Sequence, residues 1–346
     1  MENKVLRIID ANLNRAMEGI RVVEDVVRFV WNHKALAQKL KNLRSELKEL
    51  SDDLPISKLE LLKARKSDYD VGADLYSRGE GRRSDITEII TSNLKRTQEA
   101  IRVLEEFGKT FGQKFGRGFK ALRFKVYDLE KEIVEVTAKK GRLDFDLYVI
   151  TDPDSKYPHE EIAKKSIAGG AKIIQLRDKK VMLGEYFKYA KKIREITKKA
   201  GVTFIVNNYV DICKASDADG VHLGQQDVPI SVAKELLGEE KIIGVSTHSV
   251  AQAIKAEKQG ADYISVGPIF ATPSKSGFMP VGTSIIREVK KKVKIPFVAI
   301  GGIDESNIRE VLRAGAKHVA AIKAISTKRN ITNAVKELRN LIRRKS

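Results

Sequence analysis

The chain has 346 residues, of which 42% are hydrophobic and 32% are charged, as is typical of a globular protein. No apolar run approaches the roughly 20 residues that a membrane-spanning helix needs, so we expect no membrane partner. The single cysteine, Cys213, has no second cysteine to pair with, which favours a reducing compartment. The first ten residues, MENKVLRIID, lack the apolar core of a secretory signal. We therefore predict a cytoplasmic protein.

The formal net charge of +19 has three physical explanations. Lys and Arg are interleaved with Glu in segments such as KKIREITKKA, which is typical of solvated helix faces. A basic protein can also hold anionic substrates or bind nucleic acid. Because nucleic-acid surfaces need clustered basic and aromatic side chains, and aromatic residues make up only 6%, we expect no nucleic-acid partner. Charge alone does not decide between the other two explanations.

Residues 1–115 have helical apolar spacing almost throughout. This segment contains an internal repeat, because residues 12–24 recur as residues 93–105 with eight of thirteen positions identical. Arg and Glu recur three residues apart in both copies, where they can pair along a helix. Two interpretations remain open. The two helices form a symmetric pair with salt-bridged faces, or their arginines flank a phosphate pocket.

The segment between the repeats, SDYDVGADLYSRGEGRRSD at 67–85, combines glycines with arginines and acids. Such a composition suits a mobile anion-binding loop, and it suits a polar surface loop equally well. After the second repeat, residues 115–140 predict one long helix that joins the two parts of the chain.

From Asp144 onward, short apolar β-rich runs alternate with amphipathic helical stretches. Eight such units predict an α/β fold, a (β/α)8 TIM barrel preceded by a smaller all-α domain. The predicted domains are 1–125 and 126–346. A doubly wound open sheet is the alternative, which the absence of an early glycine-rich nucleotide turn disfavours. The strand candidates are DLYVIT, KIIQLR, VTFIVN, GVHL, KIIGVS, YISVGP, FVAIGG and HVAAIK.

The carboxyl ends of these strands, where barrel enzymes carry their active sites, are unusually polar. The Gly301-Gly302 pair lets backbone amides approach an anion, and with Ile322-Lys323 it forms the usual barrel phosphate cradle. Asp227 and an oxygen of Asn208 are suited to Mg²⁺, which binds few carboxylates and shares substrate phosphate. Further cations follow strands two and six, more than one monophosphate needs: Arg177, Lys179 and Lys275.

The strings QLRDK, VHLGQQD, GVSTHS, GPIFATPSKSG and AIGGI, in this order, resemble the thiamine phosphate synthase family over residues 142–330. The resemblance implies that a pyrimidine diphosphate condenses with a thiazole phosphate, with release of pyrophosphate. Implied catalytic residues are Arg177, Lys179, Ser246 and Lys275. Implied contacts of the pyrimidine diphosphate are Gln175, Leu176, Arg177, Asp178, Lys179, Asn207, Ser246 and Lys275. Implied contacts of the thiazole phosphate are Thr272, Ser274, Gly302, Ile322 and Lys323. Implied Mg²⁺ ligands are Asn208 and Asp227.

The chain departs from this family's pattern at three positions. Asn208 replaces a second metal carboxylate, which removes a negative charge. Ser274 replaces a threonine and keeps the hydroxyl, and Lys323 stands where a small hydroxyl residue is common. A thiazole tautomerase on the same barrel is the alternative function. It would need no diphosphate site, so the cations together with Asp227 argue against it.

The N-terminal strings ARKSDYDVGADL and SNLKRTQEAIRVLEEFG resemble a small helical domain often fused to such synthases. That domain is associated with phosphorylating hydroxymethylpyrimidine phosphate, although no Walker loop is present. Among the histidines, we expect His222 to be packed and hydrogen-bonded, and His248 stays ambiguous. The sequence leaves a homo-oligomer open. The residues to follow in the helical domain are Asp70, Arg82, Arg83, Arg96 and Arg102.

Overall fold

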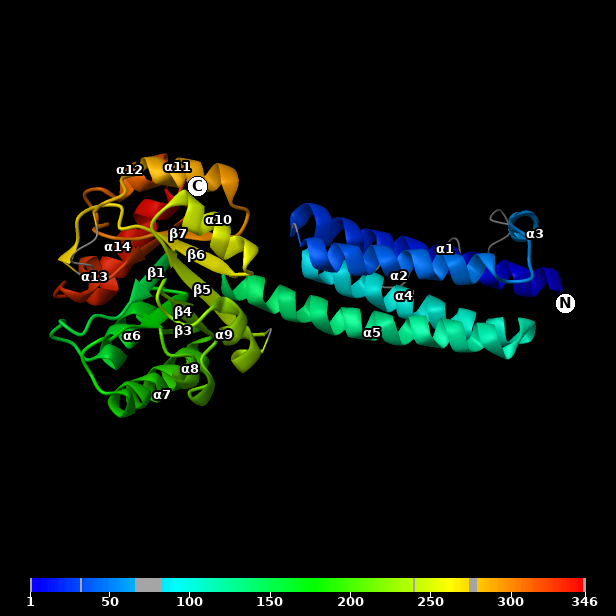
Figure 1. The fold of residues 1–346 in the computed structure, drawn as a ribbon, viewed down its shortest axis with the longest axis horizontal. Helices are drawn as coiled ribbons and strands as arrows, with labels where there is room; N and C mark the ends of the chain where they lie inside the picture. Colours follow the sequence, from blue (N-terminus) through cyan, green and yellow to red (C-terminus); the bar gives the residue numbers. More distant parts are fainter. Residues whose placement is uncertain (1, 32, 66–82, 239, 274–278, 345–346) are drawn as a thin grey trace. The chain divides into compact units, whose positions relative to one another are not determined.

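A computed structural model describes residues 2–31, 33–65, 83–238, 240–273 and 279–344. The chain divides into two compact units, Met1–Thr137 and Ala138–Ser346, which are described separately (Figure 1). The predicted division after residue 125 and the observed one after Thr137 both fall within a single helix, α5 (Gln113–Arg142). Because this helix has no break, the local sequence pattern does not mark the residue at which the contacts change.

The first unit is built of helices, as predicted. After α1 come a short π-helical segment, η1, and then α2 and α3; α4 and a 3₁₀ turn, η3, precede α5. The apolar faces of these helices enclose one core that includes Ile20, Leu40, Ile101 and Phe119. The bounds are α1 Glu2–Asp25, η1 Val26–Val30, α2 Lys34–Asp52, α3 Lys58–Ala64, α4 Ile86–Gly108 and η3 Lys109–Phe111.

The two copies of the repeat form α1 and α4, which pack against each other. A Cβ atom added at Gly19 would lie 2.3 Å from Oγ1 of Thr97, so the close approach of the two helices requires glycine there. Each copy buries one glutamate against an arginine of another helix: Glu24 accepts from Arg44 and Glu105 accepts from Arg123. The repeat thus forms a packed pair with salt bridges, as the first interpretation predicts.

The second unit is a closed barrel of eight parallel strands in sequential order, with helices around the outside (Figure 1). All eight predicted strands are present, and the predicted fold class is confirmed. The strands are β1 Leu147–Ile150, β2 Ile173–Leu176, β3 Thr203–Asn207, β4 Gly220–Leu223, β5 Ile242–Thr247, β6 Tyr263–Val266, β7 Phe297–Ala299 and β8 His318–Ala321. The helices are α6 His159–Ala168, α7 Leu183–Ala200, α8 Val210–Ala215, α9 Ile230–Leu237, α10 Val250–Lys258, α11 Ser284–Lys292, α12 Ile308–Arg313, α13 Lys323–Ser326 and α14 Ile331–Arg343.

Alternate residues of each strand point outward to the helices or inward to the barrel axis. The inward side chains, Tyr148, Ile173 and Tyr263 among them, pack with Leu143 and Phe145 from the segment before β1. Since this packing fills the amino-terminal end of the barrel, the carboxyl end remains open for ligands. No helix in the described part of the chain is long and apolar enough to span a membrane.

Candidate active site

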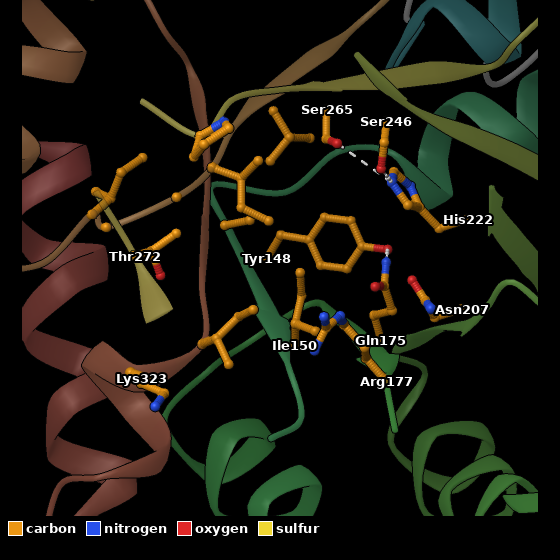
Figure 2. A pocket seen from close by; sticks show the side chains of 18 of the residues that line it. Tyr148, Ile150, Gln175, Arg177, Asn207, His222, Ser246, Ser265, Thr272 and Lys323 are labelled. Carbon is orange, nitrogen blue, oxygen red and sulfur yellow. Dashed lines mark hydrogen bonds between the residues drawn. The ribbon is translucent and has the colours of Figure 1, made fainter. Parts of the chain in front are cut away.

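A cavity of about 970 Å³ opens at the carboxyl ends of the strands, and every one of the eight strands or the loop after it contributes to its lining. Figure 2 shows Gln175, Asn207 and Ser246 on one side of the Tyr148 ring, and Thr272 and Lys323 on the other. The polar strand ends that the sequence singled out therefore meet in one place.

Most of the predicted site residues line this cavity, although they are distributed over nearly 150 positions of the sequence. The structure describes neither Ser274 nor Lys275, so those two predictions lie outside the described residues. The predicted residues that line the cavity are Gln175, Arg177, Lys179, Asn207, Asn208, Asp227, Ser246, Thr272, Gly302, Ile322 and Lys323.

Leu176 and Asp178 do not line the cavity. Leu176 is fully buried in the core between strands and helices. Asp178 accepts hydrogen bonds from the backbone N–H groups of Lys180 and Val181, and its Oδ2 lies 3.0 Å from Nε2 of His159. Burial opposes ionisation of Asp178, but these hydrogen bonds outweigh it and hold its pKa below the usual value. The two residues were expected among the ligand contacts. Alternation along β2 turns Leu176 away from the barrel axis, and Asp178, two residues past the end of the strand, is turned toward His159.

Arg177 and Lys179 supply positive charge at the end of β2. Arg177 is partly buried, and burial lowers the pKa of its guanidinium, although nearby Asp152 opposes this shift. Arginine nevertheless stays charged at neutral pH. Its backbone N–H donates to Oγ1 of Thr151 (3.1 Å), which fixes the start of the loop. Lys179 is exposed at the rim, so one cation lies inside the cavity and one at its mouth.

Asp227 and Asn208 lie together where the loops after β3 and β4 meet. Oδ2 of Asp227 accepts from the backbone N–H of Gly224 (2.6 Å) and from Nδ2 of Asn208. Asn208 has φ 68°, a conformation that asparagine tolerates better than most residues. No group of three or more His, Cys, Asp or Glu forms a metal site within the described ranges. The amide oxygen of Asn208 accepts from Nδ2 of Asn207, so a Mg²⁺ ion here would be held by the Asp227 carboxylate, by that amide oxygen once the amide turns, and by substrate oxygens and water.

Glycines shape the cavity wall after β7. Gly301 has φ 102° and Gly302 has φ 64°, and a Cβ at Gly302 would lie 2.6 Å from the carbonyl oxygen of Ala271. Nδ2 of Asn307 donates to the carbonyl of Gly302 (2.8 Å), which holds the turn. The backbone at this point carries no side chain that would keep an anion away, as the predicted anion contact requires.

A buried chain of hydrogen bonds crosses the floor of the cavity. Nε2 of Gln175 donates to the hydroxyl of Tyr148 (2.9 Å), which lies 2.8 Å from the hydroxyl of Tyr263. That hydroxyl lies 2.9 Å from Nδ1 of His222, and Nε2 of His222 lies 3.0 Å from Oγ of Ser246. His222 is thus packed and hydrogen-bonded, as expected. Neither tyrosine was predicted from the sequence as a site residue, although each occupies an inward strand position, which was the available signal.

His248 also lines the cavity, and its Nδ1 lies within hydrogen-bonding distance of the carbonyl of Gly267. The backbone N–H of His248 donates to Oε1 of Gln252 (2.7 Å). Gly267 precedes Pro268 through a cis peptide bond. This histidine is therefore held in place by the loop after β6, beside the proposed substrate contacts.

The fold and this cavity define a barrel enzyme for small phosphorylated substrates, and comparison with known proteins agrees. Residues 147–325 match the family described as thiamine monophosphate synthase, and residues 7–132 match the ThiD2 family. The chain belongs to the thiamine-phosphate synthase family. It is thus a transferase of thiamine biosynthesis, as the resemblance predicted.

The relatives match over nearly the whole chain. The thiamine-phosphate synthase of Synechocystis is 41% identical over 96% of this chain and 95% of its own length. The enzyme of Nostoc (strain PCC 7120) is 40% identical over 94% of this chain and 90% of its own length. A solved thiamine phosphate pyrophosphorylase from Pyrococcus furiosus aligns with a TM-score of 0.55 at 40% identity, covering 59% of this chain and 98% of that one.

Proposed function

We propose that the cavity holds 4-amino-2-methyl-5-hydroxymethylpyrimidine diphosphate at the ends of β2 to β5 and 4-methyl-5-hydroxyethylthiazole phosphate at the ends of β6 to β8. The observation that carries this assignment is one cavity lined by two separate sets of anion-binding groups. Arg177 and Lys179 belong to one set, with Asp227 in the same cavity to hold a metal ion, and Gly302 and Lys323 belong to the other. A single monophosphate would need only one of these two sets.

In this reaction the protein has to stabilise pyrophosphate as it leaves the pyrimidine. Breaking the bond between the pyrimidine methylene carbon and the diphosphate oxygen places negative charge on the diphosphate, and the guanidinium of Arg177 and the ammonium of Lys179 stabilise it. The thiazole nitrogen then attacks the electron-deficient methylene carbon. No protein nucleophile is required, so the residues act by binding, by orientation and by exclusion of water.

We assign Mg²⁺ to Asp227 and Asn208, with the diphosphate of the substrate completing its coordination. Mg²⁺ supplies neutralising charge to the leaving group when it is bound. Asp227 is suited to this role because its Oδ1 is not used by the hydrogen bonds from Gly224 and Asn208, which both go to Oδ2. We also place the enzyme in the cytoplasm, which the buried thiol of Cys213 supports.

Alanine variants on the two sides of the cavity test this assignment. Lys179→Ala should raise KM for the pyrimidine diphosphate by about tenfold, the value of one charged hydrogen bond, and leave KM for the thiazole phosphate near normal. Thr272→Ala should do the reverse. Initial rates of thiamine phosphate formation, measured while one substrate is varied at a time, give both constants. If each variant raised both constants equally, the two-sided assignment would be wrong.

A second function, phosphorylation of hydroxymethylpyrimidine phosphate by the helical unit, is favoured by the ThiD2 match at residues 7–132. Asp10, which is buried, holds Arg65 through two hydrogen bonds (2.7 and 2.8 Å) directly before the predicted anion-binding loop. Arg102 pairs with Glu105 and Glu106, so Arg96 is the better candidate of these two arginines of α4 for a phosphate contact. Asp70 and Arg82 lie outside the described residues.

The full chain tests the second function when the barrel is disabled by Arg177→Ala, because any pyrimidine diphosphate then accumulates. We expect ATP-dependent conversion of the pyrimidine monophosphate, with Arg96→Ala in the same background reducing it. The absence of diphosphate from the folded Arg177→Ala protein would rule out this activity.

A further inference from the structure

The buried hydrogen-bond chain on the cavity floor joins two residues of the proposed pyrimidine site. Gln175 and Ser246 lie on different strands, β2 and β5, and three side chains connect them: Tyr148, Tyr263 and His222. Gln175, Tyr148 and Tyr263 are at most 2% exposed, and His222 is 6% exposed. Nothing in the proposed reaction uses the three connecting side chains directly, so their arrangement calls for its own explanation.

The protonation states along the chain follow from burial. Burial raises the pKa of Tyr148, and it raises that of Tyr263 well above the ordinary value, so both hydroxyls stay neutral. A buried polar group without a partner is costly, and each hydroxyl has only one hydrogen to donate. A neutral chain of this kind therefore runs in a single direction from one end to the other.

The direction follows from the orientation of the Gln175 amide, whose nitrogen faces the Tyr148 hydroxyl. Because its amide nitrogen donates to Tyr148 (2.9 Å), Tyr148 must donate to Tyr263, and Tyr263 must donate to Nδ1 of His222. The imidazole then carries its proton on Nε2 and donates to Oγ of Ser246 (3.0 Å). Oγ of Ser265, at 3.4 Å, is the longer partner of the same nitrogen. Figure 2 shows the Gln175 amide reaching the Tyr148 hydroxyl and His222 lying beside Ser246.

The cavity consequently presents a fixed pair of hydrogen-bonding groups. The amide oxygen of Gln175 is left as an acceptor, and the hydroxyl of Ser246, which already accepts from His222, is left as a donor. A 4-aminopyrimidine offers the complementary pair, an amino donor beside a ring-nitrogen acceptor. Its 4-oxo counterpart offers the opposite pair, a carbonyl acceptor beside a ring N–H donor. The oxo ring would instead need a donor from Gln175 and an acceptor at Ser246, the opposite of the pair that this direction of the chain presents.

We propose that Tyr148, Tyr263 and His222 are positioning residues that fix the direction of this chain and thereby select the 4-amino ring over the 4-oxo ring. The inference rests on the proposed placement of the pyrimidine at Gln175 and Ser246. A site built to hydrogen-bond a substrate rejects an analogue that reverses the pairing by a large factor, because buried polar groups are left unpaired. We expect about 10⁴-fold discrimination in the unmodified enzyme.

Tyr263→Phe in the full chain tests this proposal, because it removes one hydroxyl from the middle of the chain and leaves the ring. The measurements are KM for the 4-amino diphosphate and Ki for the 4-oxo diphosphate as a competitive inhibitor of thiamine phosphate formation. The ratio of Ki to KM should fall at least tenfold, since each half of the cut chain can then reverse independently. Thr197→Val, which removes a fully buried hydroxyl from α7 that bonds only within its helix, is the control and should keep the ratio.

Equal weakening of both ligands by Tyr263→Phe, or an unchanged ratio, would overturn the proposal, since a purely structural role predicts either result. If that variant fails to fold, Tyr148→Phe cuts the same chain one bond earlier and carries the same expectation. An unmodified enzyme that forms no thiamine phosphate would instead overturn the proposed function, and the inference would fall with it.

Discussion

At the scale of single residues, the site separates side chains that meet the substrates from side chains that hold them in place. Arg177 is partly buried at the end of β2 and lines the cavity. Arg343, by contrast, is 57% exposed in its ion pair with Asp146 on the outside of the barrel. Both are arginines with carboxylates nearby. A comparison of their alanine variants therefore shows how the position of an arginine, in the cavity or outside the barrel, affects activity and stability.

Arg177→Ala should lower kcat/KM by about 10²–10³-fold, which is typical when one preorganised group that stabilises developing charge is lost. Because the side chain projects into the cavity rather than the core, the melting temperature should change by only a few degrees. Steady-state kinetics and thermal unfolding of this variant and of Arg343→Ala provide the comparison. Near-normal turnover in Arg177→Ala would remove Arg177 from the site.

Asn208→Asp should strengthen Mg²⁺ binding, because it adds a second carboxylate beside Asp227, and hard divalent ions bind more tightly as ligand charge rises. We expect the apparent Mg²⁺ affinity to rise about tenfold, measured by calorimetry with and without pyrophosphate. An isosteric change keeps the positive φ, which aspartate also tolerates. Unchanged affinity in both conditions would mean that residue 208 does not contact the metal.

The sequence indicated which residues line the cavity where polarity is unusual, and it did not do so where geometry decides. The charged and amide residues after the strands were recognised because polar side chains are unexpected at the end of a buried strand. Leu176 and Asp178 were assigned to the ligand together with their neighbours, although alternation turns Leu176 outward and Asp178 faces His159. Tyr148 and Tyr263 are separated by 115 positions, so only closure of the barrel brings their hydroxyls together.

At the scale of elements, the turn after β7 is constrained by both conformation and space. Gly302 and Gly201 share φ 64°, but a Cβ at Gly201 meets nothing within 4 Å, whereas one at Gly302 meets Ala271 and Phe270. The two glycines therefore separate the cost of the left-handed conformation from the cost of crowding.

Gly201→Ala should destabilise the protein by about 1–2 kcal/mol, the cost of the left-handed conformation. Gly302→Ala should lower the free energy of unfolding by roughly a further 1–3 kcal/mol, as is typical of overpacking. It should also raise KM for the thiazole phosphate. Urea unfolding and steady-state kinetics measure the two effects. Equal destabilisation by both variants would show that the loop after β7 relaxes freely.

A second element-scale feature is the ion cluster that ties α7 to the starts of β4 and β5. Asp217, at φ 54°, lies 3.1 Å from a guanidinium nitrogen of Arg194 and 3.0 Å from Nζ of Lys241. Burial opposes its ionisation, but the hydrogen bonds from Lys241 and Arg194 outweigh it and lower the pKa of Asp217 to about 2.

The pKa of Asp217 is lowered on folding. The charged carboxylate therefore contributes fully to the free energy of unfolding above its pKa in the unfolded chain, about 4, and this contribution is lost as the pH falls toward 2. Asp217→Asn keeps the left-handed backbone and should cost less than about 1 kcal/mol at pH 7, since the side chain is 60% exposed. The difference from the unmodified protein should shrink between pH 4 and pH 3 in urea unfolding. A difference that is constant with pH would exclude the charge as its origin.

At the scale of the whole molecule, the fold could be predicted from the sequence because apolar residues recur with different spacings in its two parts. Apolar runs alternating with amphipathic helices predicted the barrel, and continuous helical spacing predicted the first unit. The division between the units was not readable, since it falls inside α5. The repeat was detected from identical residues, and its close packing at Gly19 became visible only when the helices were placed together.

The central claim is that this chain forms thiamine phosphate in the cavity of its barrel. The most direct measurement mixes the purified full chain with the pyrimidine diphosphate, the thiazole phosphate and Mg²⁺, and follows thiamine phosphate and pyrophosphate together. We predict that the two products appear in equal amounts, that both depend on Mg²⁺, and that the formation of both slows by about 10²–10³-fold in Arg177→Ala. Folded protein that forms neither product, or pyrophosphate without thiamine phosphate, would contradict the claim.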